Sequence, residues 1–139
     1  MPEQPSPRFH EAKIRVRFAE TDQMGVVYHS NYLIWMEVGR VEYCRARGMR
    51  YRDLEAEGVL LTVVEAHCRF IAPAKYDDEV IVRTWVEQAN PRMVLFAYEI
   101  TEAESAKVLA TGVTKHFFCG KDGKLRKLPA EHMALFELD

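Results

Sequence analysis

The sequence predicts an α+β fold in which one five-stranded antiparallel sheet wraps around a single long helix. Three observations support this: a strand-like segment precedes an unusually apolar helical segment, four strand-like segments follow it in succession, and neither a repeat nor a linker divides the 139 residues. A chain of this length builds one hydrophobic core more readily than two. We therefore expect a single domain over residues 12–139, preceded by a flexible tail over residues 1–11.

The first strand is predicted over residues 13–20, where apolar and basic residues alternate. Ile14, Val16 and Phe18 share one side of this segment and are expected to face the core. A polar loop that contains Gly25 connects the strand to the helix.

The long helix is predicted from about Tyr32 to Arg47, with an N-cap supplied by Ser30-Asn31 and a stop at Gly48. Its apolar residues recur at helical spacing. The expected buried face comprises Ile34, Val38, Val41 and Cys44, widened by Leu33 and Trp35. Because so apolar a helix is unusual at a surface, we expect the sheet to cover it.

The remaining strands are predicted over residues 59–70, 79–88, 93–101 and 107–119. Asn90-Pro91 and Lys121-Asp122-Gly123 mark turns between or after them. Residues 129–138 begin with a proline and are expected to form a short helix.

Composition and charge exclude several classes of protein. A net charge of −2 argues against a general nucleic-acid or anionic-membrane surface. No apolar run approaches the roughly 20 residues that span a bilayer, and the first residues lack the pattern of a signal peptide. Three widely spaced cysteines without a C-x-x-C pair indicate reduced thiols and a cytoplasmic location.

Asp22 is the candidate catalytic residue, because it lies in the loop that leads into the helix. Unpaired N–H groups at a helix N-terminus favour negative charge and could stabilise the oxyanion formed when a carbonyl is attacked. Asp22 could act as nucleophile or as general base on water. The alternative is local: Thr-Asp-x-x-Gly is common turn chemistry, and Asp22 would then only cap a turn.

His29 immediately precedes the candidate cap and could bind a ligand, transfer a proton or supply its backbone N–H to an oxyanion hole. Tyr28 and Asn31 could contact substrate, although a tyrosine beside a helix start usually packs. Gly25 is expected to adopt a positive φ or to allow a close backbone approach.

No cofactor or metal motif is visible: the five histidines and three cysteines lack ligand spacing, and there is no glycine-rich phosphate loop. We expect no cofactor and no metal. Among the scattered basic residues, Arg92 and Lys115 are candidates for holding the phosphates of a nucleotide-bearing substrate.

Residues 15–43 carry a specific pattern: Asp22, two spacers, Gly25, two apolar residues, Tyr28-His29, and then Asn31-Tyr32 into a helix. This segment resembles the 4-hydroxybenzoyl-CoA thioesterase family, and most of all its branch of Tol–Pal-associated bacterial acyl-CoA thioesterases. The segment from Cys68 to Asp78 resembles the second strand and following turn of that family. The resemblance covers roughly residues 12–120.

The resemblance implies a hotdog fold and hydrolysis of an acyl-CoA to a carboxylate and coenzyme A. It implies that Asp22 is the catalytic carboxylate and that the N–H of His29 contributes to an oxyanion hole, with Tyr28 and Asn31 around them. It also implies a homodimer or homotetramer with sites at the subunit interface, and no metal or prosthetic group.

Two alternatives remain open. A hotdog enoyl-CoA hydratase or dehydratase would use His29 as base, with Glu37 on the helix as its acid partner. A non-catalytic module would bind acyl-CoA and leave it intact.

Overall fold

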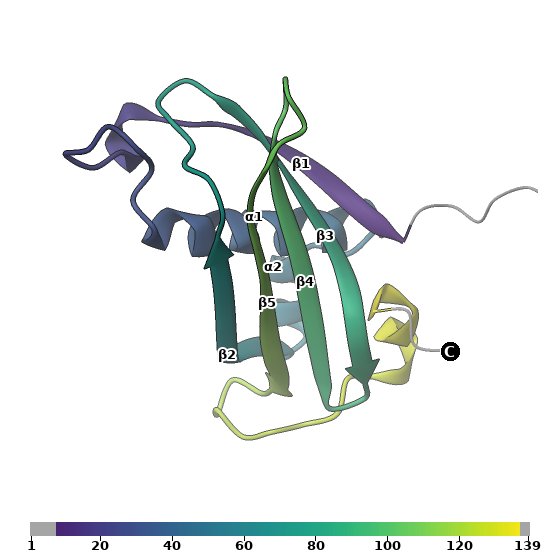
Figure 1. The fold of residues 1–139 in the computed structure, drawn as a ribbon. Coiled ribbons are helices and arrows are strands. Elements are labelled where there is room, and N and C mark those ends of the chain that lie inside the picture. Colours follow the sequence, from purple (N-terminus) through teal and green to yellow (C-terminus); the bar gives the residue numbers. More distant parts are fainter. Residues whose placement is uncertain (1–7, 137–139) are drawn as a thin grey trace, which may run out of the picture.

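The computed structural model describes residues 8–136, and their order of elements follows the predicted fold (Figure 1). The strands are β1 (Phe9–Arg15), β2 (Leu60–Phe70), β3 (Glu79–Asn90), β4 (Met93–Glu102) and β5 (Val108–Cys119). The α-helices are α1 (Ser30–Ala46) and α2 (Tyr51–Ala56), and two short 3₁₀ helices are η1 (Phe18–Glu20) and η2 (Ala130–Phe136).

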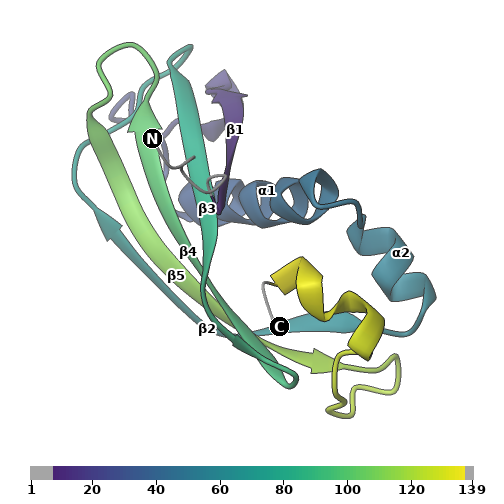
Figure 2. The ribbon, with the colours of Figure 1, turned by 90° about the vertical axis from the view of Figure 1, so that its right-hand side faces the viewer.

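The five strands form one antiparallel sheet in the order β1-β3-β4-β5-β2, which curves around α1 (Figure 2). Among the described residues, β2 pairs only with β5, so its other edge is free there. The prediction of five antiparallel strands around a long helix is confirmed.

The first strand differs from its prediction at both ends. β1 begins at Phe9, inside the segment expected to be a tail, and residues 1–7 of that segment lie outside the described residues. Val16 is buried as predicted, but the chain then turns into η1. This turn breaks the alternation, so that Phe18 is 75% exposed instead of facing the core. Its ring packs against the ring of Tyr76 instead.

The face of α1 that meets the sheet also differs from the prediction. The residues that α1 buries are Tyr32, Trp35, Met36, Gly39, Arg40, Tyr43 and Cys44. Leu33, Ile34 and Val38, which were expected to face the core, are exposed. Since apolar residues surround the helix on most sides, their spacing alone could not select the buried face.

Two glycines explain how closely the elements approach. A Cβ at Gly39 would collide with the side chain of Thr84 on β3, so the sheet passes directly against the helix there. A Cβ at Gly112 would lie 2.5 Å from Met36 Cε and 2.7 Å from the carbonyl oxygen of His67. This confirms the close backbone approach that a glycine inside a strand indicates.

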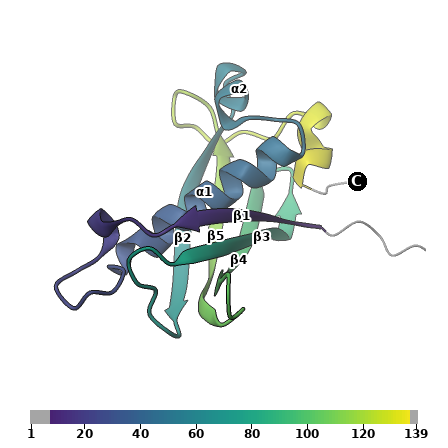
Figure 3. The same cartoon turned by 90° about the horizontal axis from the view of Figure 1, so that it is seen from above.

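Two short helices cover the end of the molecule opposite the Asp22 loop. α2 follows α1 and was not predicted, whereas η2 confirms a short helix within residues 129–138. Seen from above, the loop between β1 and α1 projects beyond the sheet at the end where α1 begins (Figure 3).

Candidate active site

Asp22 opens a tight turn that returns the chain toward α1. Its carbonyl oxygen accepts a hydrogen bond from Gly25 N–H at 3.0 Å, and its own N–H donates to the carbonyl oxygen of Val26 at 2.8 Å. Gly25 has φ of 78°, which confirms the positive φ predicted for it. The turn therefore fixes the backbone that carries the Asp22 carboxylate.

One oxygen of the Asp22 carboxylate is engaged in the turn, and the other is not. Oδ1 accepts hydrogen bonds from Met24 N–H at 2.8 Å and Val26 N–H at 3.4 Å. Within residues 8–136, Oδ2 has no hydrogen-bond partner. The turn-capping interpretation and the catalytic one are thus compatible, because each uses a different oxygen atom.

Asp22 and His29 line the same cavity of about 320 Å³. The cavity lies between the Asp22 loop, the first turn of α1 and the end of β2, where Phe70 and Ile71 form an apolar wall. The Phe70 ring contacts the rings of Tyr32 and His29, with centroids 5.3 Å and 6.1 Å away. The cavity therefore combines one carboxylate, one imidazole and apolar surface.

His29 is the N-cap residue of α1, but its side chain does not cap the helix. Its backbone N–H has no hydrogen-bond acceptor among the described residues, so this donor is free at the helix N-terminus. The His29 ring stacks against Tyr28 at a centroid distance of 4.3 Å. Tyr28 is exposed, and its ring is not among the groups that line the cavity.

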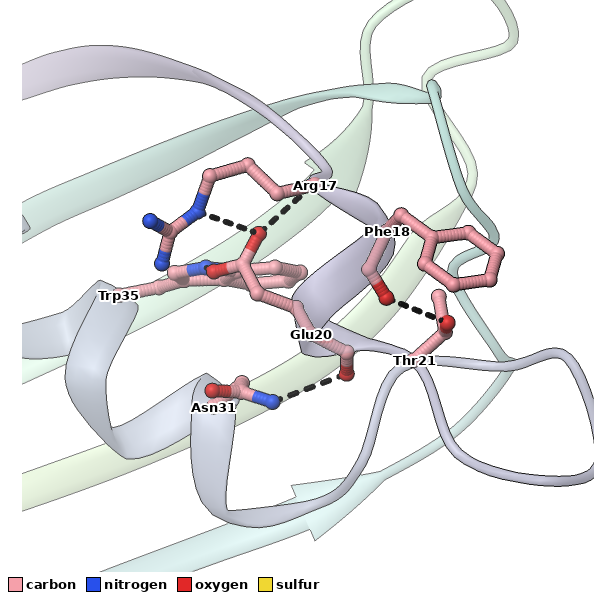
Figure 4. Close-up of polar contacts among 6 residues, drawn as sticks. All are labelled: Arg17, Phe18, Glu20, Thr21, Asn31 and Trp35. Carbon is pink, nitrogen blue, oxygen red and sulfur yellow. Dashed lines mark hydrogen bonds and ion pairs between the residues drawn. The ribbon is translucent and has the colours of Figure 1, made fainter.

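A buried carboxylate that we did not assign a role from the sequence supports this loop. Glu20 is only 4% exposed, and its side chain accepts hydrogen bonds from the Trp35 indole N–H at 2.8 Å and from the backbone N–H of Arg17 at 2.7 Å (Figure 4). Burial acts to raise the pKa of Glu20, but these hydrogen bonds and the Arg17 guanidinium outweigh it and lower the pKa. The side chain is therefore a paired, ionised anchor.

The backbone of Glu20 completes the connection to α1. Its carbonyl oxygen accepts a hydrogen bond from the Asn31 side-chain amide at 2.9 Å (Figure 4). It accepts another from Tyr28 N–H at 2.8 Å. Asn31 thus holds the loop against the helix start, where a helix cap was predicted. The only sequence signal for Glu20 was its position: it is an acidic residue on the side of the predicted strand that Val16 and Phe18 share.

The remaining predicted residues lie apart from this cavity within the chain. Arg92 is exposed in the β3–β4 turn, where its carbonyl oxygen accepts a hydrogen bond from Phe118 at the far end of β5. Lys115 alternates with the buried Thr114 and His116, so it projects from the outer face of the sheet. Glu37 lines a different cavity from His29, so this chain does not form the pair expected of a hydratase.

Cysteine and metal chemistry do not converge on Asp22 in the described part of the chain. All three cysteines are free, and burial raises the pKa of Cys44 to about 12 and also raises that of Cys68. Among residues 8–136, one group has metal-ligand character, formed by Glu57, Glu131 and His132. His132 Nε2 and Glu57 Oε2 are 2.7 Å apart, so an ion pair or hydrogen bond accounts for this contact.

Among the described helices, none combines the length and the apolar character that a bilayer span requires.

Comparison with known families gives a clear match. Residues 16–136 match the family model described as the thioesterase-like superfamily. The chain belongs to the thioesterase-like superfamily. Its expected hotdog fold is confirmed by solved thioesterase structures that superpose on it.

Among curated members, a protein of Bacillus subtilis (strain 168) with the name "Putative acyl-CoA thioesterase YneP" is 46% identical over 88 residues. The match spans 63% of this chain and 64% of that protein, which is just under two thirds of its length.

Two solved members of similar shape cover most of the chain. A hypothetical protein from Thermus thermophilus has 36% identity and a TM-score of 0.85, and the match covers 91% of this chain and 95% of that one. A DHNA-CoA thioesterase from Staphylococcus aureus has 33% identity and a TM-score of 0.83, covering 86% of this chain and 80% of that one.

Proposed function

We propose that this protein hydrolyses the thioester of an acyl-CoA to a carboxylate and free coenzyme A, with Asp22 as the catalytic carboxylate. The observation that carries the proposal is the free Oδ2 of Asp22 in the same cavity as the helix start at His29. The acyl-CoA thioesterases among its relatives support the same reaction. A thioester is activated, so one carboxylate and an oxyanion site form a sufficient minimum.

Two routes use these groups. In the first, an Asp22 oxygen attacks the thioester carbon and expels coenzyme A thiolate, and water then cleaves the mixed anhydride. In the second, Asp22 takes a proton from water while the water oxygen attacks the same carbon, and the C–S bond then breaks to release coenzyme A thiolate. In both, the N–H of His29 donates a hydrogen bond to the carbonyl oxygen as its negative charge develops. The His29 imidazole contributes to the shape of the cavity and needs no proton transfer.

The free edge of β2 is the proposed contact with a second copy of the chain. Exposed sheet edges bind other strands unless they are protected, and β2 carries the exposed apolar residues Val63 and Val64. The exposed Leu33, Ile34 and Val38 on α1 add apolar surface for an oligomer to cover. We propose a homodimer joined along β2, or a homotetramer of such dimers, with an Asp22 site at each interface.

Three narrower proposals rest on sequence. The pattern from Asp22 to Tyr32 supports membership of the Tol–Pal-associated branch, and the three free cysteines support a cytoplasmic location. Arg92 and Lys115 are proposed contacts of the coenzyme A phosphates on the basis of charge alone. Arg92→Ala would then raise the KM for acyl-CoA more than it lowers kcat.

The test is a panel of acyl-CoAs in which released thiol is detected. We expect wild-type turnover of at least one acyl class and a loss of about 100-fold or more in kcat for Asp22→Asn. Equal turnover by wild type and Asp22→Asn would show that Asp22 is not the catalyst. A substrate that binds and is recovered intact would favour a non-catalytic module, and hydration of an enoyl-CoA would favour the hydratase.

The two routes can be separated by a single turnover in water labelled with heavy oxygen. In the nucleophilic route, water that attacks the Asp22 carbonyl of the mixed anhydride places the label on Asp22 and releases an unlabelled first product. Water that attacks the acyl carbon labels the product instead, and the anhydride is then identified by borohydride reduction, which converts Asp22 to homoserine. General-base catalysis places the label in the first carboxylate product and leaves Asp22 unlabelled.

A further inference from the structure

A second cavity of about 320 Å³ lies along the other half of α1, between α1, α2 and the start of β2. Its walls carry several polar side chains: the buried Arg40, the half-buried Tyr51, and the exposed Glu37, Glu55 and Thr62. We call it the Arg40 cavity. No step of the proposed hydrolysis uses it.

Two buried polar groups in the Arg40 cavity make no hydrogen bond of good geometry with the described residues. Arg40 is 9% exposed, and neither its Nε nor the Tyr51 hydroxyl has a partner of good geometry among the described residues. Burial raises the pKa of Tyr51 well above its usual range, while the nearby Arg40 opposes this, so the hydroxyl stays protonated. Leaving a buried donor unpaired is unfavourable, and a hydrogen bond to a ligand oxygen would remove that penalty.

The position of the Arg40 cavity on β2 indicates what that ligand is. This cavity is lined by Leu60 and Thr62 at the first end of β2, and the Asp22 cavity is lined by Phe70 and Ile71 at its last end. When two copies pair antiparallel along the free edge of β2, the first end of one strand lies beside the last end of the other. Each Asp22 cavity then adjoins the Arg40 cavity of the neighbouring subunit.

We infer that the Arg40 cavity receives the far end of the acyl group whose thioester lies at Asp22 of the partner subunit, and that it selects acyl groups ending in a hydroxyl. This inference rests on the proposed thioesterase function and on the β2 dimer.

The polar groups of the Arg40 cavity favour an acyl group that ends in a hydroxyl over one that ends in a carboxylate or a methyl group. Arg40 Nε–H and the Tyr51 hydroxyl can donate to its oxygen, and the carboxylate of Glu37 or Glu55 can accept its proton. A carboxylate end would face those two acids, and a hydrocarbon end would leave both buried donors unpaired.

Matched substrates test the selection. Octanoyl-CoA, ω-hydroxyoctanoyl-CoA and octanedioyl-CoA, with the corresponding six-carbon set, differ only at the far end of the acyl group. We expect kcat/KM to be about tenfold higher for a hydroxyl end than for either other end. Tyr51→Phe should reduce this preference to within about twofold, because it removes one hydroxyl and little volume.

Tyr76→Phe is the matched control, since Tyr76 is exposed and does not line the Arg40 cavity, and it should keep the full preference. An equal kcat/KM for all three ends, or a preference that Tyr51→Phe leaves intact, would overturn the inference while thiol release still upheld the thioesterase. No thiol release from any substrate would overturn both.

A mixed dimer tests whether the selection acts across the interface. Two tagged copies are expressed together, one carrying Asp22→Asn and the other Tyr51→Phe, and the doubly tagged dimer is isolated. If the Arg40 cavity serves the partner, the single active site combines native Asp22 with native Tyr51 and keeps the wild-type preference. If it serves its own chain, the active site carries Phe at position 51 and the preference is lost, which would overturn the arrangement.

Discussion

Buried polar groups near the N-terminal end of α1 are hydrogen-bonded, whereas several along its second half are not. At the N-terminal end, the buried Glu20 carboxylate accepts hydrogen bonds from Trp35 and Arg17, and Asp22, the proposed catalytic residue, is partly exposed. Along the second half, four buried polar atoms lack partners within residues 8–136: Arg40 Nε, the Tyr51 hydroxyl, Thr84 Oγ1 and His116 Nδ1. Paired groups hold a geometry in place, whereas unpaired ones retain binding capacity for something else.

The largest expected effect comes from substitution of Asp22, near the N-terminal end of α1. It is an effect on the catalytic rate and not on stability. Asp22→Asn should lower kcat by about 100-fold or more, because a neutral amide is neither a nucleophile nor a base. The free energy of unfolding should change by less than about 0.5 kcal/mol, because the amide oxygen still accepts from Met24 and Val26 N–H. Denaturant unfolding and steady-state kinetics of the same preparation measure both.

For Glu20, which anchors the loop that carries Asp22, we expect a larger effect on stability than on rate. Glu20→Gln should cost about 1–3 kcal/mol of unfolding free energy, because one of its two buried hydrogen bonds now meets an amide N–H instead of an acceptor oxygen. Activity at low temperature should fall less than for Asp22→Asn. Glu11→Gln, on the exposed end of an ion pair with Arg83, is the control and should change the unfolding free energy by less than about 1 kcal/mol. Equal losses of unfolding free energy in Glu20→Gln and Glu11→Gln would contradict the anchor role of Glu20.

We expect the loss of unfolding free energy at acidic pH to originate at His116, near the second half of α1. Burial first, and the charge of Arg40 second, lower the pKa of His116 to about 3. Between its ordinary pKa of about 6.5 and that value, the unfolded chain binds a proton that the folded chain does not. Unfolding free energy should therefore fall as pH drops through this window, by at most about 1.4 kcal/mol per pH unit.

His116→Gln should flatten that dependence, and His10→Gln, at a half-buried position on β1, should leave it in place. A titration of unfolding free energy against pH measures the slope. Glu20 acts in the same direction at lower pH, because its lowered pKa adds stability that is lost as the folded carboxylate is protonated. A slope unchanged in His116→Gln would place the acid sensitivity elsewhere.

The smallest expected effect is a small gain in unfolding free energy on substitution of Arg40. Arg40→Met keeps an unbranched side chain of similar length but removes a buried charge that lacks a hydrogen bond at Nε. Replacing such a buried charge by an apolar group is often neutral or stabilising, so we expect unfolding free energy to stay level or rise by about 1 kcal/mol. Thermal and denaturant unfolding provide the measurement. A loss of about 3 kcal/mol would mean that Arg40 is structurally paired, and that the second half of α1 resembles the first.

The sequence by itself determined the local parts of this protein. The period-two segments predicted the strands, and the glycine at position 25 predicted the turn with positive φ that carries Asp22. Asp22 and His29 lie seven positions apart, so one loop could bring them to one cavity without knowledge of the fold. The short range of these contacts is why they were predictable.

Only the tertiary structure decided the rest. The buried face of α1 depends on where the sheet passes closest, at Gly39 against Thr84, and a helix with apolar residues on most sides does not predict that choice. Glu20 and Trp35 meet across a turn that reverses the strand, and Arg40 lies near Tyr51 and His116 because α2 and β5 are both folded against α1. Such contacts are set by packing between distant segments, because a buried polar group is defined by its neighbours and not by its place in the chain.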